Sequence, residues 1–166
     1  MAAALHLMKR IYMCAYKRKS WSEKLHDARL PYIEIAGKNF AGIRAGQKML
    51  IPTPKLVDDY IRQIPAGRTV DTGTLRKDLA IEHGAEVTCP LTTGIFLRIA
   101  AESAYEDYEK GKAIDSITPF WRVIDEKSTT AKKLTFGIQF LKEQREKEVH
   151  CKALATPLST ERNLGH

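Results

Sequence analysis

The sequence predicts a mainly helical α+β protein that is organised around a helix-turn-helix. Three observations support this prediction. Two helix-sized segments, about residues 72–83 and 90–111, are joined by a short polar connection that contains glycine. A third helix-sized segment before them carries one apolar stripe. Residues 32–35 alternate with the period of a β-strand.

Both helices of the predicted pair have start or stop signals. Asp71 is a candidate N-cap, because its carboxylate can accept hydrogen bonds from the first free N–H groups of a helix. Gly84 suits the left-handed position that follows a helix. Pro90 is favourable as the first residue of the second helix, which runs towards Gly111. The second helix of a helix-turn-helix enters a groove of DNA, so the pair predicts a nucleic-acid contact.

The pair is preceded by a predicted N-terminal extension, residues 21–53. Ser20 and Glu23 have the spacing of a capping box, which predicts a short helix at its start. Residues 32–35 are predicted as a strand, and residues 49–52 as a buried extended piece.

The main domain is predicted to open with a helix at Pro54. Counted from Leu56, its apolar residues recur at i, i+1, i+4, i+5 and i+8, which puts them on one face. Asp58, Asp59 and Arg62 are assigned to the opposite, solvated face. The two aspartates are interpreted as a solvated pair and not as an acid–base dyad.

The helix pair is predicted to bury one face of each helix. The expected core positions are Leu75, Leu79, Ala80, Leu91, Ile95, Ile99 and Ala100. The expected surface positions are Arg76, Lys77, Thr92, Thr93, Phe96 and Arg98. Small hydroxyl side chains allow a close approach to a sugar-phosphate backbone, and arginine neutralises phosphate. Among these surface residues, Arg76, Thr92, Thr93 and Arg98 are therefore predicted to contact DNA.

Two motifs within residues 64–123 carry a resemblance. They are Ile64-Pro65-Ala66-Gly67-Arg68-Thr69-Val70 and Pro119-Phe120-Trp121-Arg122-Val123. They resemble the "IPxGxV" and "PCHRV" motifs of the DNA-binding domain of the 6-O-methylguanine-DNA methyltransferase family, which includes the non-catalytic alkyltransferase-like proteins. The resemblance covers roughly residues 54–145. It implies a winged helix-turn-helix domain over residues 54–150.

Further elements are expected near the C-terminal end of that domain, of which only the wing is implied by the resemblance. Residues 115–123 are expected as a loop and a short strand, and residues 127–135 as the wing. Residues 131–149 are expected as a closing helix, with Leu134, Ile138 and Leu141 on its apolar face.

The chain differs from the family at the residues that carry out alkyl transfer. Phe120 stands where the family has its alkyl-accepting Cys, and Trp121 stands where it has His. The family's Tyr in the first helix falls at Thr72, and its Arg finger falls near Leu91 or Thr92. The resemblance therefore implies a DNA-repair protein of the alkyltransferase-like type, which senses alkylated guanine without alkyl transfer.

The resemblance also implies the remaining site residues. Pro119, Phe120 and Trp121 are expected to line the lesion pocket, either as a filled pocket or as a stacking platform. Arg122 and Thr72 are expected to contact DNA. An arginine in an apolar motif is costly to bury alone, so Arg122 should reach the surface or an anion.

Two other functions stay open on the sequence alone. One is an active methyltransferase that uses Cys89, which precedes a helix N-terminus where a thiolate is favoured. The other is a module that keeps only the fold and binds proteins or undamaged DNA. His83, Cys89, His150 and Cys151 match no metal-binding spacing, and no phosphate loop, dinucleotide fingerprint or Ser/His/Asp triad is present. No cofactor and no metal are predicted.

The net charge of +7 is unevenly distributed. Residues 1–20 hold five Lys or Arg and no acidic residue, whereas residues 51–124 hold nine basic and eleven acidic residues. Residues 1–20 are therefore predicted as a basic arm in which Lys17, Arg18 and Lys19 contact DNA phosphates. A solvated tail is the alternative interpretation.

Composition sets the expected compartment and partners. No apolar run approaches the roughly 20 residues of a membrane span, and the apolar start precedes the first basic residues, the reverse of a signal peptide. Three cysteines without a pairing pattern suit a reducing compartment. We expect a cytoplasmic, nucleoid-associated monomer that binds double-stranded DNA, plain or alkylated, and a repair-protein partner. Residues 151–166 are expected to be disordered.

Overall fold

The computed structural model describes residues 18–155, and the side chains of residues 18–150. Most of the predicted arm, including Lys17, lies outside this part of the chain. So do residues 156–166 of the predicted tail. Residues 151–155 were expected to be disordered, but they form the last turns of a helix.

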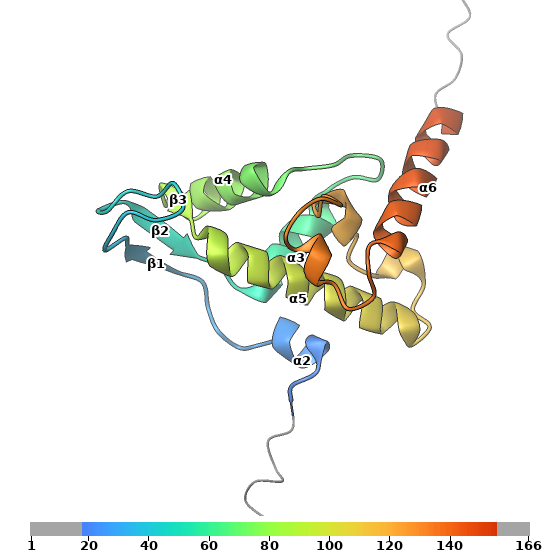
Figure 1. The fold of residues 1–166 in the computed structure, drawn as a ribbon, viewed down its shortest axis with the longest axis horizontal. Helices are drawn as coiled ribbons and strands as arrows, with labels where there is room; N and C mark the ends of the chain where they lie inside the picture. Colours follow the sequence, from blue (N-terminus) through green and yellow to red (C-terminus); the bar gives the residue numbers. More distant parts are fainter. Residues whose placement is uncertain (1–17, 156–166) are drawn as a thin grey trace, which may run out of the picture.

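The described residues form a mainly helical structure with a small sheet, as the predicted mainly helical α+β class requires (Figure 1). The α-helices are α2 (Trp21–Leu25), α3 (Pro54–Gln63), α4 (Thr72–Glu82), α5 (Pro90–Glu109) and α6 (Gln139–Ala155). The strands are β1 (Tyr32–Ile35), β2 (Lys48–Ile51) and β3 (Val87–Thr88). The 3₁₀ helices are η1 (Ile114–Ser116), η2 (Phe120–Arg122) and η3 (Ala131–Lys133). None of the described helices is both long and apolar enough to span a membrane.

The sheet joins the N-terminal extension to the helix pair. β2 lies in the centre, antiparallel to β1 with Tyr32 opposite Ile51, and parallel to β3 with Leu50 opposite Thr88. β3 was predicted only as part of a turn. Because its two strand residues pair with β2, the extension and the helix pair form one packed unit.

The core is built around α5, which runs through the middle of the molecule (Figure 1). Leu97 of α5 is buried in one cluster with Val57 of α3 and Leu79 of α4. Leu25 of α2 and Leu50 of β2 belong to the same cluster. The hydrophobic core therefore continues across the predicted border between residues 21–53 and 54–150.

The predicted N-caps Ser20 and Asp71 and the predicted stop at Gly84 are confirmed. Ser20 Oγ accepts a hydrogen bond from Glu23 N at 3.1 Å, and Ser20 N donates to the Glu23 carboxylate at 2.6 Å. Asp71 accepts from the backbone N–H groups of Gly73 and Thr74. Gly84 has a φ of +67°, as a residue that ends a helix in the left-handed region requires.

The buried face of α5 differs from the prediction. Leu91 and Ile95 are 64% and 57% exposed, whereas Thr93 and Phe96 are buried. The buried stripe therefore begins at Thr93 and not at Leu91. Thr93 can be buried because its hydroxyl donates a 2.7 Å hydrogen bond to the backbone oxygen of Cys89.

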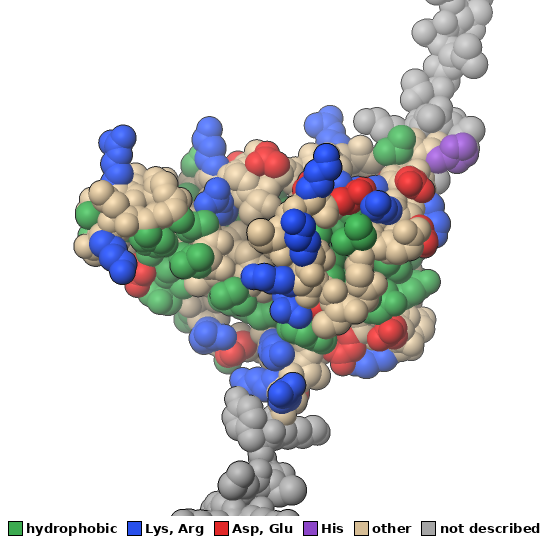
Figure 2. Space-filling view, in the orientation of Figure 1, with side chains coloured by type: hydrophobic (Ala, Val, Ile, Leu, Met, Phe, Trp, Pro, Cys, Tyr) green, Lys and Arg blue, Asp and Glu red, His purple; other side chains and the backbone are tan. Residues whose placement is uncertain are grey.

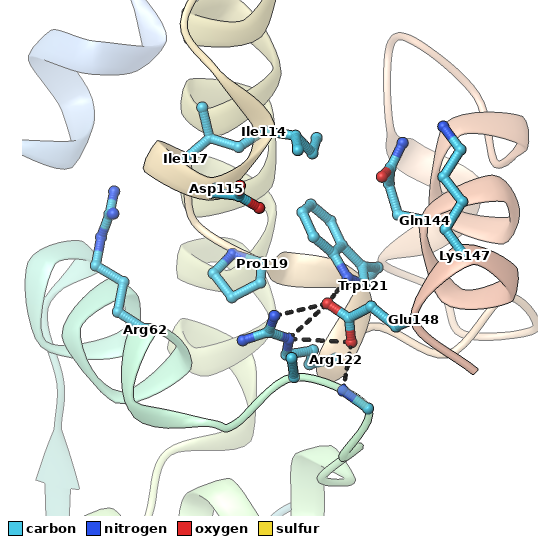
Figure 3. Close-up of a pocket in the computed structure, with 12 residues that line it drawn as sticks. Arg62, Ile114, Asp115, Ile117, Pro119, Trp121, Arg122, Gln144, Lys147 and Glu148 are labelled. Atoms are coloured by element: carbon cyan, nitrogen blue, oxygen red, sulfur yellow. Dashed lines mark hydrogen bonds and ion pairs between the residues drawn. The ribbon is translucent and has the colours of Figure 1, made fainter. Parts of the chain in front are cut away.

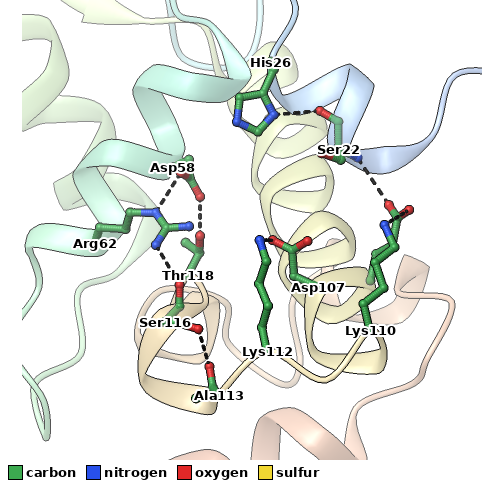
Figure 4. A network of polar contacts seen from close by, with 11 residues as sticks. Ser22, His26, Asp58, Arg62, Asp107, Lys110, Lys112, Ala113, Ser116 and Thr118 are labelled. Atoms are coloured by element: carbon green, nitrogen blue, oxygen red, sulfur yellow. Dashed lines mark hydrogen bonds and ion pairs between the residues drawn. The ribbon is translucent and has the colours of Figure 1, made fainter.

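Asp58 was assigned to a solvated face, but its side chain is buried (Figure 4). The Arg62 guanidinium donates to it from 2.9 Å, and the Thr118 hydroxyl also donates to it. Arg62 in turn donates to the backbone oxygen of Ser116. Buried carboxylates persist when they are paired and hydrogen-bonded, so Asp58 ties α3 to residues 116–118.

The C-terminal elements also differ from the prediction. Residues 115–123 form η1 and η2 with no strand, and residues 127–135 form turns and η3 where a wing was expected. The closing helix begins only at Gln139, because Gly137 has a φ of +76° that helical residues do not adopt. Ile138 consequently precedes the helix and is partly exposed, whereas Leu134 and Leu141 are buried as expected.

Candidate nucleic-acid interface

The helix pair α4–α5 is held together through β3. The Thr88 hydroxyl donates a 2.8 Å hydrogen bond to the backbone oxygen of Arg76, so the strand before α5 is tied to the middle of α4. α5 begins at Pro90, directly after Cys89, which follows β3.

The residues predicted to contact DNA fall into two groups. Thr72, Arg76 and Thr92 are half-buried and lie at the surface of α4 and α5. Thr93 is fully buried and makes no surface contact, because its hydroxyl is used inside the molecule. Arg98 pairs with the buried Glu102 at 3.3 Å, so much of its charge is neutralised within the protein.

Six surface cations near the helix pair have no carboxylate partner among the described residues. They are Arg68, Arg76, Lys77, Lys127, Lys132 and Lys133, here called the free cations. Only Arg76 was predicted as a site residue. The three lysines were missed, although their segment, residues 127–133, contains no acidic residue.

The lysine segment lies beside the N-terminal half of α5. A Cβ atom added to Gly94 would lie 4.0 Å from the Thr130 hydroxyl, which shows how close the two segments are. Figure 2 views the face on which this segment crosses α5, and Lys and Arg side chains gather over the middle of that face. This surface has the unpaired positive charge that phosphate binding requires.

Two predicted arm residues lie within the described part of the chain. Arg18 and Lys19 are both exposed, and Lys19 lies 3.8 Å from the carboxylate of Asp27. Asp27 also binds Arg29 at 3.0 Å. Lys19 is therefore partly neutralised, whereas Arg18 has no carboxylate partner among the described residues.

Arg122 is bound by the protein itself (Figure 3). Its Nε and Nη2 donate to the Glu148 carboxylate at 2.9 Å and 2.6 Å, and its Nη1 donates to the backbone oxygen of Ile64 at 2.6 Å. The anion that the sequence led us to expect beside Arg122 is thus a carboxylate of α6. No sequence pattern marks Glu148, which lies in a helix with many Lys and Glu residues.

Glu148 has two further partners, which makes it the centre of an Arg122–Glu148 cluster. It accepts hydrogen bonds from the Trp121 indole N–H and the Gly67 backbone N–H, each at 2.8 Å. Burial acts to raise the pKa of Glu148, but these hydrogen bonds and the Arg122 charge outweigh it and lower the pKa. The cluster joins both motifs of the resemblance to α6.

Phe120, at the position of the family's nucleophile, is fully buried. Its ring lies 5.4 Å from Trp121, 5.6 Å from Phe136 and 6.0 Å from Phe140, measured between ring centroids. The expected lesion pocket is therefore filled at this position, because four aromatic rings pack there. The alternative, a stacking platform, requires an open ring face that Phe120 does not have.

Pro119 and Trp121 do line a cavity, of about 770 Å³, between α6, the loop after α3 and residues 114–119. We call it the C-terminal cavity. None of the residues that line it belongs to α4 or α5. It is therefore separate from the surface that carries the free cations, and Trp121 presents little area to it because its side chain is 3% exposed.

Cys89 is buried at the start of α5 and is not disulfide-bonded. Cys89 is only 5% exposed and so presents little surface to a base held in DNA, which argues against its use as a nucleophile. Within the described part of the chain, no three His, Cys, Asp or Glu side chains come together in a way that could hold a metal ion.

Comparison of this chain with known protein families, with curated proteins and with solved structures finds no match.

Proposed function

We propose that this chain binds double-stranded DNA through α4 and α5 and transfers no alkyl group. The observation that carries the proposal is the set of free cations beside the N-terminal half of α5. Other cations of the described chain are paired with carboxylates, such as Arg62 with Asp58 and Arg122 with Glu148. Cations without a protein partner are the ones that release counterions from DNA when they meet phosphate.

The absence of alkyl transfer rests on the two positions at which a reactive thiol was considered, residues 120 and 89. The place of the family's nucleophile holds the buried ring of Phe120, which has no group that accepts an alkyl. Cys89 is buried in another part of the fold. Incubation with DNA that carries a labelled 6-O-methylguanine should leave the protein mass unchanged. A gain of one methyl group on any cysteine would show that the chain is an enzyme.

The resemblance to alkyltransferase-like proteins extends the proposal to the sensing of alkylated guanine in DNA repair, at the nucleoid. Because Phe120 fills the place of the expected pocket, we propose that selectivity comes from the DNA. A damaged base pair is weaker, so a duplex that contains one costs less to deform. No stacking of the lesion on Phe120 is required.

Binding titrations test this proposal. A plain duplex and a duplex with one 6-O-methylguanine would be titrated with the protein at several salt concentrations. We expect the logarithm of the binding constant to fall linearly with the logarithm of the salt concentration, and the damaged duplex to bind more tightly. A protein that binds neither duplex at low salt would contradict the proposal, and equal affinities would remove lesion sensing from it.

One observation favours a second function, a protein-interaction module. Leu91 and Ile95 are exposed on the face of α5 that a DNA-reading helix would present to a groove. Apolar side chains read only the thymine methyl group in DNA, but they are common at protein interfaces. Leu91→Ser with Ile95→Ser separates the two functions: loss of a protein partner with unchanged DNA affinity would favour the second.

A further inference from the structure

Strand β1 forms an open edge of the sheet (Figure 1). Ala36, directly after β1, uses both of its backbone groups inside the sheet: its N–H donates to Gln47 at 2.9 Å, and its C=O accepts from Gly46 at 2.8 Å. These groups alternate in direction along an extended strand, so those of Ile33 and Ile35 point outward. They have no hydrogen-bond partner among the described residues.

The hydrogen bonds of β2 give the same direction. The backbone oxygens of Lys48 and Leu50 accept from the side on which β3 lies. These two residues lie opposite Ile35 and Ile33, so neither of these pairs exchanges hydrogen bonds between β1 and β2. The outer edge of β1 can therefore bind one further extended strand.

Large apolar side chains are exposed around this edge. Six of the ten exposed large apolar residues in the described part of the chain lie in or just before β1 or in the first turns of α5. They are Leu30, Tyr32, Ile33, Ile35, Leu91 and Ile95. Figure 2 shows hydrophobic side chains gathered at the end of the molecule that carries the sheet. An exposed apolar patch of this kind marks an interaction surface.

A cavity of about 620 Å³, here called the sheet cavity, lies beside β1. Its apolar walls include Tyr32 of β1, Met49 and Ile51 of β2, and Phe40 and Leu91. Successive side chains of a strand point to opposite faces of a sheet, so every second side chain of a strand added to β1 would reach the sheet cavity. The sheet cavity thus favours apolar side chains at alternate positions of the added strand.

The charge at one end of β1 is positive. Lys38 and Arg44 lie between β1 and β2, and Lys48 lies opposite Ile35. All three cations are exposed, and none pairs with a carboxylate among the described residues. The acidic residue of β1, Glu34, lies within the strand and would repel an acidic residue directly opposite it. A binding strand is therefore favoured if its acidic residues lie only at the Ile35 end.

We propose that β1 binds an extended peptide segment of another protein, which adds to the sheet as an antiparallel strand. Antiparallel pairing is the more stable arrangement, and it places the N-terminal end of the segment at Ile35. The segment carries acidic residues at that end, followed by apolar residues at alternate positions. The proposal gives the protein-interaction function a partner class and a binding mode, and it does not depend on DNA binding.

The test is a titration followed by ¹H–¹⁵N NMR. The probe is a capped peptide of three aspartates followed by alternating valine and threonine. We expect saturable shifts of the backbone amides of Ile33 and Ile35. With the valines in the sheet cavity, the threonine N–H groups meet β1. N-methylation of the threonine nitrogens should therefore weaken binding by about tenfold or more, whereas N-methylation of the valine nitrogens should leave the affinity unchanged.

Two variants with equal changes of charge test the acidic end. Lys38→Glu with Arg44→Glu should weaken binding of the aspartate peptide by about threefold or more at low salt. Lys132→Glu with Lys133→Glu changes the α4–α5 surface instead, and should leave the peptide affinity unchanged. Because only the second pair removes cations of the proposed DNA surface, failure of peptide binding and failure of DNA binding are observed separately.

Three results would overturn the proposal. One is the absence of shifts at Ile33 and Ile35 with millimolar peptide. Another is an affinity of the threonine-methylated peptide that equals or exceeds that of the valine-methylated peptide, since backbone pairing in the proposed register would then play no part. The third is the same set of shifts when the protein is concentrated without peptide, which would mean that a second copy of the chain occupies the edge.

Discussion

The surface of α4 and α5 and the Arg122–Glu148 cluster use positive charge in opposite ways. In the cluster, Arg122 is enclosed by Glu148 and the Ile64 carbonyl, and its side chain is 15% exposed. On the α4–α5 surface, Lys132 and Lys133 have no carboxylate within reach among the described residues. The motif that resembles an alkyltransferase active site thus has a structural use in this chain, and the charge that is free to bind a partner lies elsewhere.

The largest expected effect separates the aromatic core from that surface. Phe120→Ala should lower the free energy of unfolding by about 3–5 kcal/mol, because it opens a cavity among four packed rings. Chemical denaturation measures the change. Leu91→Ala, at an exposed position, should change the free energy of unfolding by less than about 0.5 kcal/mol. Similar losses for the two variants would mean that Phe120 is not core.

The second effect depends on pH and belongs to the Arg122–Glu148 cluster. The pKa of Glu148 is lowered in the folded protein, so its ionised form is favoured by folding. Its contribution to stability is therefore fully present above the ordinary carboxyl pKa and is lost as pH falls through the lowered pKa.

Glu148→Gln isolates this contribution. Breaking a largely buried ion pair costs about 3 kcal/mol, and the difference in unfolding free energy between wild type and Glu148→Gln should have that order at pH 7. The difference should shrink as the pH falls below about 4.5. A difference that stays constant from pH 7 to pH 3 would show that the Glu148 charge has no part in the cluster.

A smaller effect tests the corrected orientation of α5. Thr93→Val removes a buried hydroxyl that donates to the Cys89 carbonyl, and should cost about 1 kcal/mol of stability while DNA affinity stays the same. The neighbouring residue Thr92 is half-buried at the surface. If Thr92 meets the DNA backbone, Thr92→Val should weaken DNA binding and leave stability unchanged. A selective loss of DNA binding in Thr93→Val would restore the original prediction for this residue.

The smallest effect on stability concerns the exposed apolar pair of α5. Leu91→Ser with Ile95→Ser should change the free energy of unfolding by less than about 1 kcal/mol, since both side chains are largely exposed. Light scattering of the wild type and the variant measures self-association. If the wild type formed larger particles and the variant were monomeric, the result would contradict the expected monomer.

Local features of this fold could be predicted from the sequence. The cap residues Ser20 and Asp71, the stop at Gly84 and the start at Pro90 act through hydrogen bonds and backbone preferences within a few residues. Such interactions depend little on the rest of the molecule, so a single sequence is enough to locate them.

The buried face of α5 could not be predicted in the same way. Leu91, Ile95, Phe96 and Leu97 place apolar residues on all sides of the first turns, so the periodicity fits more than one face. The packing of α2, α3 and residues 120–136 selects the face, and those contacts are far away in sequence. Glu148 was missed for the same reason, because its partners Gly67, Trp121 and Arg122 come from other elements.

The free cations allow the most direct test of the central claim, that DNA binds the α4–α5 surface. Lys127, Lys132 and Lys133 would be replaced together by Gln, and Lys55, Lys110 and Lys112 would be replaced by Gln in a control of equal charge. The control lysines are each paired with an aspartate or glutamate. Both variants should keep the fold, because all six side chains lie at the surface.

The measurement is the slope of the logarithm of the DNA-binding constant against the logarithm of salt concentration. If each of Lys127, Lys132 and Lys133 meets a phosphate, the negative slope of the first variant should become shallower by about 0.9 for each lysine. The slope of the control should match that of the wild type. Equal slopes in the two variants would contradict the account, because net charge alone, and not the α4–α5 surface, would then govern binding.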